Sequence, residues 1–170
     1  TPPKFPIGAS SRELGMNTNR AEYLTHDGVM TSDISDILFN VPEGIFIDAT
    51  YGYGSHFNYL SENHNQLNFI AFDRDEEAVF NSDPNHEVVH SNFSNIDTYL
   101  KLKKINSISG VLYDFGVSSH QLDSFHRGFS FQNNSNLDMR MDLTQKLSAK
   151  DVINKYEIDK LIDIFFRFGE

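Results

Sequence analysis

The sequence has no cysteine, no long apolar run and few basic residues. Without cysteine it can form neither a disulfide framework nor a thiolate metal site, which fits a reducing compartment. No apolar run approaches the length that spans a bilayer, so we expect no membrane contact. The chain has 14 Lys and Arg and 24 Asp and Glu, and the net charge of −10 argues against a broad, nonspecific nucleic-acid surface. Any nucleic-acid contact must then be local, or lie outside this chain.

The remaining composition is that of a folded domain. The 170 residues are 39% hydrophobic and 22% charged, which predicts a soluble, globular domain with a real core. Residues 1–19 are polar and lack the apolar core of a secretory signal, and Glu13 is unusual for an organellar targeting peptide. We therefore expect a cytoplasmic protein that begins with an N-terminal arm without a fixed fold.

The prediction of the fold starts from residues 46–56. An apolar run ends at Asp48, and a loop with Gly52 and Gly54 leads into a segment that can be helical. This order opens nucleotide-binding units, although glycines after a strand are also ordinary turn residues. The third glycine of a dinucleotide fold would fall on the bulky Phe57. The loop therefore opposes an NAD-dependent oxidoreductase and suits a ligand without phosphate, such as S-adenosylmethionine.

Apolar runs alternate with helix-like segments up to about Ser124, where the alternation stops. The pattern predicts an α/β fold in which a parallel sheet is flanked by helices. Thr31 or Ser32 is the expected N-cap of the first helix. The expected strands are 45–49, 67–73, 88–89 and 108–113, and the expected helices are 31–39, 57–62, 75–80, 96–102, 148–155 and 159–166.

Four residues lie at or just past the expected strand ends: Asp48, Asp73, Phe93 and Asp114. Right-handed crossovers bring these ends to one edge, where such sheets bind ligands. An acid at the position of Asp73 accepts hydrogen bonds from ribose hydroxyls, although it or Asp75 could instead cap the next helix. Phe93 could pack on an adenine face or belong to the core.

The stretch 114–142 mixes Gly, Ser, Asp and Arg with large apolar residues and has neither helix nor strand period. Such a segment is costly to order unless it builds a site, although its Asp and Arg residues could also simply brace a loop. Arg127 and Arg140 could contact phosphates, or they could pair with Asp123 or Asp138.

Hydrolase and metal chemistry fit the sequence less well. Ser118, Ser119 and His120 are adjacent in sequence, which is not how a nucleophile and its base are arranged, and no Gly-x-Ser-x-Gly elbow is present. The histidines are scattered, and His86 and His90 are separated by an expected strand, so we expect no metal site.

The motifs together resemble one family. In chain order they are His26 with Val29-Met30; Asp48-Ala49-Thr50 with Gly52, Gly54 and His56; Asp73-Arg74-Asp75; Asn92-Phe93-Ser94; Asp114-Phe115-Gly116-Val117-Ser118-Ser119; Gln121-Leu122-Asp123; Arg127-Gly128-Phe129-Ser130-Phe131; Leu137-Asp138-Met139-Arg140-Met141-Asp142; and Phe168-Gly169-Glu170. Over residues 22–170 the chain resembles the RsmH (MraW) family of 16S rRNA (cytosine-N4)-methyltransferases. The run 114–142 is the most specific part of the resemblance.

The resemblance implies a Rossmann-like fold that uses S-adenosylmethionine to methylate N4 of a cytidine in the decoding region of small-subunit ribosomal RNA. A helical domain is inserted after the fourth strand in this family. We therefore divide the chain into an arm (1–20), a partial methyltransferase core (21–123) and a loop with the start of the inserted domain (124–170). The resemblance places the cofactor at Gly54, Ser55, His56, Asp73, Phe93, Asp114 and Gln121.

Asp114 is also the expected catalytic residue, as the group that orients the amine or the methionine end. Several departures from the family bear on activity. Ser55 replaces a glycine and Tyr53 is bulkier than usual, which we expect to weaken cofactor binding. Family members continue well beyond Glu170, so we expect a truncated form whose sheet ends at the fourth strand. The alternatives are a non-catalytic cofactor- or RNA-binding module and a methyltransferase with another substrate; a homodimer is also an open alternative.

Overall fold

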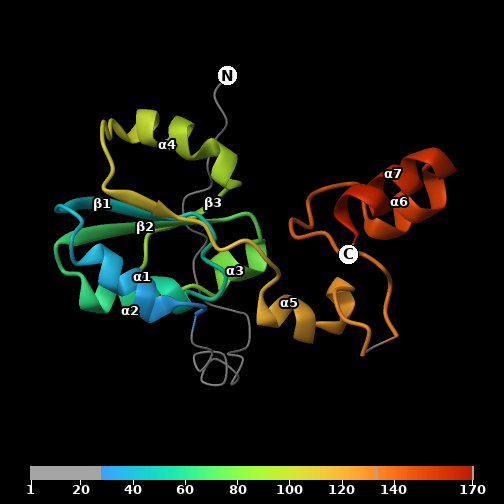
Figure 1. Cartoon of the computed structure of the whole chain (residues 1–170), viewed down its shortest axis with the longest axis horizontal. Helices are drawn as coiled ribbons and strands as arrows, with labels where there is room; N and C mark the ends of the chain where they lie inside the picture. The colour runs from blue at the N-terminus through green and yellow to red at the C-terminus, as the bar shows by residue number, and fades with distance from the viewer. Residues whose placement is uncertain (1–27, 133, 170) are drawn as a thin grey trace, which may run out of the picture.

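The computed structural model describes residues 28–132 and 134–169, so the predicted arm and His26 lie outside the described residues (Figure 1). Its centre is a sheet of four parallel strands in the order β3-β2-β1-β4. This arrangement confirms the predicted α/β class. The strands are β1 (Gly44–Asp48), β2 (Leu67–Asp73), β3 (Val88–His90) and β4 (Gly110–Leu112).

All four strands end at the same edge of the sheet, because every neighbouring pair is parallel. Asp48, the last residue of β1, is in register with Ala71 of β2 and with Leu112 of β4. Asp73, the last residue of β2, is in register with His90 of β3. The carboxyl edge therefore gathers the ends of segments that are far apart in the sequence.

Helices cover both faces of this sheet: α4 lies over one face, and α1 and α2 lie over the other (Figure 1). The six expected helices are all present, whereas the short α5 was not predicted. Within the described residues, single turns of 3-10 helix also occur at 93–95 and 125–127. The helices are α1 (Thr31–Leu38), α2 (Ser55–Asn63), α3 (Glu76–Phe80), α4 (Ile96–Lys103), α5 (Ser119–Asp123), α6 (Ala149–Lys155) and α7 (Ile158–Phe168).

The core lies on the two faces of the sheet, because side chains alternate along each strand. Ile47 and Phe72 pack with Ile96 of α4 on one face. Phe46, the neighbour of Ile47, packs with Leu60 of α2 on the other face. This double burial explains why β1 and β2 read as almost continuous apolar runs.

The N-termini of α1 and α3 test two expectations from the sequence. The expected N-cap of α1 is wrong: Met30 occupies that position in a left-handed conformation, and the hydroxyl of Thr31 instead donates to the carbonyl of Gly28. At α3, Asp75 is the N-cap and its carboxylate accepts from the backbone N–H of Glu77 at 3.1 Å. Asp73 therefore stands at the strand end without serving as the cap.

The segment after β4 leaves the sheet and continues through α5 to α6 and α7, which lie to one side of it (Figure 1). Most apolar residues of α7 are exposed, among them Ile162, Phe165 and Phe166. In the described part of the chain, no helix has the length and apolar character needed to cross a bilayer.

Candidate functional site

A cavity of about 710 Å³ lies at the carboxyl edge of the sheet. This volume is in the range of small-molecule sites. Asp73, Phe93 and Asp114, which follow three different strands, line it together with Gln121 of α5. The structure thus brings four of the predicted site residues around one space. Its other walls are Val29, Ala49, Thr50, Gly52, Arg74, Asp75, Ala78, Phe115, Gly116, Val117, Ser118 and Met141.

The glycine loop forms one wall of this cavity. Gly52 has a φ of +55°, and a Cβ built on it would meet no atom within 4 Å, so the loop presents bare backbone to open space. Gly54 (φ +78°) is the N-cap of α2. Gly54, Ser55 and His56 turn into the helix and are not among the residues that line the cavity.

Phe57 occupies the position where a dinucleotide fold has its third glycine. Its side chain is only 4% exposed, and its ring lies 5.7 Å from that of Tyr51 and 5.6 Å from that of Phe69. Phe57 is therefore a core residue, and the start of α2 has no room there for a pyrophosphate.

Asp73 presents its carboxylate at the cavity wall in a fixed orientation. One oxygen accepts the backbone N–H of Gly52 and the other accepts that of Asp75, each at 2.8 Å. A carboxylate oxygen can accept more than one hydrogen bond, so both oxygens can also receive a ligand hydroxyl. Burial raises the pKa of Asp73 above its usual value.

Asp48 lies behind the cavity wall and is almost completely buried, with 2% exposure. Its Oδ1 accepts the backbone N–H of Thr50 at 3.1 Å, whereas its Oδ2 has no hydrogen-bond partner among the described residues. Burial raises the pKa of Asp48 to about 6, and the nearby carboxylates of Asp73 and Asp114 act in the same direction. Three acids at one edge favour a ligand that carries positive charge.

Asp114 lies just beyond the end of β4, which is shorter than predicted. Its backbone N–H donates to the hydroxyl of Thr50 at 2.8 Å, and its Oδ2 lies 3.7 Å from Nδ1 of His56. The rings of Phe93 and Phe115 lie beside it, with their centroids 5.8 Å apart. Phe93 also packs against the core, so it belongs to the core and to the cavity wall at once.

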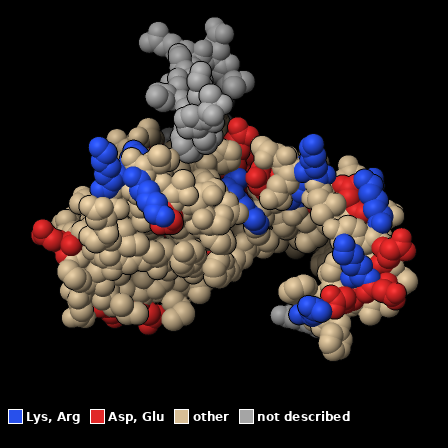
Figure 2. Space-filling model, turned by 90° about the horizontal axis from the view of Figure 1, so that it is seen from above, with Lys and Arg blue, Asp and Glu red and all other residues tan. Residues whose placement is uncertain are grey.

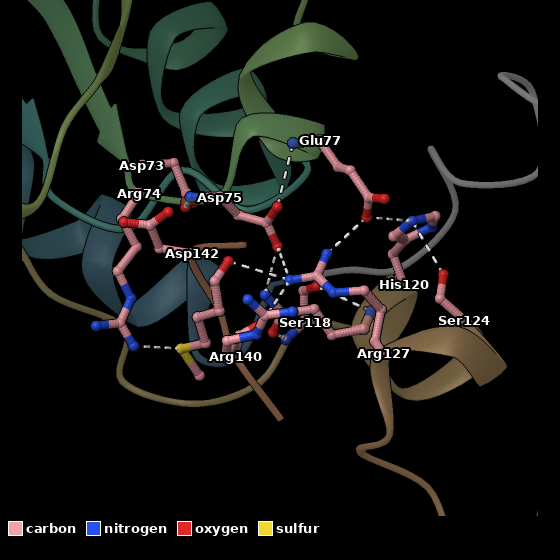
Figure 3. A network of polar contacts seen from close by, with 12 residues as sticks. Asp73, Arg74, Asp75, Glu77, Ser118, His120, Ser124, Arg127, Arg140 and Asp142 are labelled. Carbon is pink, nitrogen blue, oxygen red and sulfur yellow. Dashed lines mark hydrogen bonds and ion pairs between the residues drawn. The ribbon is translucent and has the colours of Figure 1, made fainter. Parts of the chain in front are cut away.

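A buried network fastens the outer wall of the cavity to α3 (Figure 3). Arg127, with 0% exposure, donates to Asp75 at 2.8 Å and to Glu77 at 2.6 Å. It also donates to the backbone carbonyls of Arg140 and Met141, both at 3.0 Å. Gln121 donates to the same oxygen of Asp75 at 2.7 Å. One guanidinium thus holds three separate segments together.

Arg127 and Arg140 both brace the chain through contacts with its own acids. The expected pairing of Arg127 with Asp123 is wrong, because its partners are the acids of α3. Arg140 makes the expected pair with Asp138 through two hydrogen bonds of 2.7 Å, which hold the pKa of Asp138 below its usual value. No sequence pattern indicates the contacts of Arg127, because its partners lie about fifty residues away.

The serines and the histidine of residues 118–124 make contacts within α5 and with α3. The hydroxyl of Ser118 accepts the backbone N–H of Gln121 as the N-cap of α5. Nε2 of His120 lies 3.0 Å from the Ser124 hydroxyl and 3.4 Å from Glu77. Ser118 is thus a helix cap, and His120 joins α5 to α3. No cluster of three metal-ligating side chains occurs among residues 28–132 and 134–169.

A parallel sheet with a cavity at its carboxyl edge, an acid after β2 and an acid after β4 define a Rossmann-like domain of the kind that binds nucleoside cofactors. The chain belongs to the MraW methylase family, whose model matches residues 23–170. It is 43% identical over 152 residues to the ribosomal RNA small subunit methyltransferase H of Caldicellulosiruptor saccharolyticus. It is 42% identical to the protein of the same name from Caldicellulosiruptor bescii. Each match covers 85% of this chain and 50% of the relative, so the chain spans about half the length of these relatives.

Replacing Arg127 with methionine should lower the free energy of unfolding by about 3–5 kcal/mol, because it leaves the buried Asp75 and the neighbouring Glu77 without their counter-charge. Arg167→Met is the matched control, since it removes only an exposed pair with Asp163 and should cost less than about 1 kcal/mol. Urea denaturation of both variants measures the difference. Equal losses would show that Arg127 does not hold the segments together.

Asp48 predicts a pH dependence of stability. Its pKa in the folded chain, about 6, lies above its ordinary value of 3.8, so the folded state binds the proton more tightly. Its contribution to stability is therefore largest at low pH and falls as the pH rises from about 4 to about 6. Asparagine cannot ionise, so the Asp48→Asn variant does not lose stability in this way. The free energy of unfolding of Asp48→Asn, relative to that of the original chain, should therefore rise by about 3 kcal/mol across that window.

The measurement is urea denaturation of the original chain and of Asp48→Asn at a pH below and a pH above this window. Other carboxylates titrate in both proteins, so the difference between the two isolates Asp48. A difference that stays constant with pH would contradict the buried, poorly partnered state of this carboxylate.

Proposed function

We propose that this chain binds S-adenosylmethionine at the carboxyl edge of its sheet and takes part in the methylation of N4 of a cytidine in the decoding region of small-subunit (16S-type) ribosomal RNA. The family and the names of the two relatives support this proposal. The observation that carries it is the convergence of Asp73, Phe93 and Asp114 on one cavity.

The cavity fits the chemistry of this cofactor. Asp73 holds two carboxylate oxygens toward the site and would accept the ribose hydroxyls. Phe93 offers an aromatic surface for the adenine. The negative charge of Asp114 and of the acids behind it favours a cationic sulfonium and ammonium. When bound, S-adenosylmethionine would supply a methyl group on a positively charged sulfur.

Two glycines that line the cavity, Gly52 and Gly116, leave space for the cofactor because they have no side chain. A Cβ built on Gly52 or on Gly116 would meet no atom within 4 Å, so both backbones face open space. In this proposal Gly54, Ser55 and His56 act from the start of α2, and Gln121 acts from α5. The side-chain amide of Gln121 already donates to Asp75, which fixes its orientation at the cavity.

The amine of cytosine is a weak nucleophile because its lone pair is delocalised into the ring. Catalysis then depends mainly on placing the amine in line with the methyl group. Asp114 would orient the amine, since it lies at the cavity with its side chain 47% exposed. The target base would have to leave its stack to reach this position.

Contact with RNA would have to be local. Arg127 and Arg140 are engaged in bracing pairs within the chain. On the face shown in Figure 2, lysines and arginines are scattered among acids and wide uncharged areas. We also propose that residues 124–170 open an inserted helical domain, because α6 and α7 lie to one side of the sheet (Figure 1).

A cofactor-binding module without transfer activity is the second candidate. The pairing of Arg127 and Arg140 with acids of the chain favours it, because both guanidinium groups are already engaged and neither is available to hold RNA. The two candidates agree on cofactor binding and differ on methyl transfer.

Calorimetry should detect binding of S-adenosylmethionine, and Asp73→Ala should weaken it about tenfold or more, because hydrogen bonds to a charged acceptor are lost. Asp97→Ala is the control, since Asp97 is exposed on α4 and pairs only with Lys101. Circular dichroism checks that both variants fold. Unchanged affinity in Asp73→Ala would remove this carboxylate from the site, and no binding to the original chain would refute the proposed function.

Transfer of a labelled methyl group to isolated small ribosomal subunits separates the two candidate functions. If the chain transfers methyl groups, Asp114→Ala should slow the transfer about a hundredfold, because the amine is no longer held in line. Asp97→Ala again serves as the control. Binding without transfer would favour the non-catalytic module, and full activity of Asp114→Ala would exclude Asp114 from the mechanism.

A further inference from the structure

His56 is a buried histidine whose two ring nitrogens both face oxygen atoms. Nε2 lies 2.9 Å from the backbone carbonyl oxygen of Val29, which precedes α1. Nδ1 lies 3.7 Å from Oδ2 of Asp114, which follows β4. The side chain of His56 is 8% exposed, whereas that of Asp114 is 47% exposed and reaches the cavity. The ring therefore links the segment before α1 to the candidate catalytic carboxylate.

The contact with Val29 determines which nitrogen carries the proton in neutral His56. A carbonyl oxygen can only accept a hydrogen bond, so Nε2 must donate to it. In the neutral ring the other nitrogen, Nδ1, then bears a lone pair that faces the carboxylate of Asp114. Two acceptors that face each other are stabilised when a proton enters between them.

The acids around His56 also favour a positive charge on its ring. Asp48, buried in β1 with its Oδ2 unpartnered, interacts electrostatically with His56, Asp73 and Asp114. In the part of the chain that the structure describes, no Lys or Arg forms an ion pair with Asp114. A proton on His56 would therefore place a positive charge beside Asp114.

We propose that His56 and Asp114 form a proton-accepting pair for the methyl transfer. This inference rests on the proposed function and deepens it. The amine nitrogen of the base forms the new N–C bond with its lone pair, while the sulfur retains the electron pair of the broken C–S bond. The nitrogen releases one proton, keeps the N–H electron pair, and the proton passes to Oδ2 of Asp114 and on to Nδ1 of His56. His56 is a positioning residue here, since it acts through Asp114.

The resemblance assigns His56 to cofactor binding, and the pair gives its side chain a role in addition to that. The imidazole does not line the cavity but lies behind Asp114. A histidine in this place would hold the carboxylate in position before the reaction. It would also remove the proton from the cavity afterwards, so that Asp114 returns to its charged form.

Imidazole ¹⁵N NMR of the chain without cofactor tests this arrangement, with His56→Gln used to assign the signals. In the neutral ring we expect the proton on Nε2 and a bare Nδ1. Asp114→Asn should change the ¹⁵N chemical shift of Nδ1, because an amide then faces this nitrogen in place of the carboxylate. Asp114→Glu retains the carboxylate and should restore most of this shift, and Asp97→Asn should not change it.

A neutral ring with its proton on Nδ1 would overturn the proposal, because that nitrogen could not accept another. An unchanged chemical shift of Nδ1 in Asp114→Asn would overturn it as well. If Asp114→Asn does not fold, Asp114→Glu and the tautomer of the original chain still decide the question. The spectra need no bound cofactor, so an expected NMR result without cofactor binding in calorimetry would refute the proposed function but not the proton-accepting geometry.

Discussion

The cavity depends on the buried guanidinium of Arg127. The described residues of 113–142, between β4 and α6, form no strand and only the five-residue helix α5 and one turn of 3-10 helix, so hydrogen bonds within the sheet cannot hold them. Arg127 links this segment to α3 through Asp75 and Glu77, and to the backbone of residues 140 and 141. An isolated buried charge would be very costly, but here the charge is balanced by two acids and two carbonyls. The same Asp75 caps α3 and binds Gln121, so the outer wall of the cavity is built on the helix that follows Asp73.

Negative charge at the carboxyl edge gives the cavity its chemical preference. Burial raises the pKa of Asp48 to about 6, and the carboxylates of Asp73 and Asp114 lie close enough to act in the same direction. A cationic ligand or a protonated His56 would relieve this repulsion. The fold therefore concentrates acids at the place where a positively charged sulfur would react, and this favours binding before any specific contact forms.

Much of this edge could be predicted from the sequence, because parallel strands and right-handed crossovers leave little choice about where strand ends lie. Asp48, Asp73 and Asp114 were placed together on that ground alone, and the structure places them at one edge. The partners of Arg127 could not be predicted, since they depend on how an irregular segment folds back over α3. The helix α5 has only five residues, too few for a helical period to be visible. The cap of α1 was missed because Met30 adopts a left-handed conformation that its residue type does not suggest.

The site and the exposed surface of α7 belong to different parts of the chain. Every described residue that lines the cavity lies between Val29 and Met141, whereas α6 and α7 begin later. Its acids, glycines and braces therefore come from the sheet, its loops and the segment before α6. Methyl transfer also requires a substrate RNA to be held in place, and neither the braced arginines nor the scattered charges of Figure 2 provide a continuous surface for it. In the proposed function the cavity would hold the cofactor and Asp114 would orient the amine there, whereas the rest of the RNA would have to be held by other surfaces.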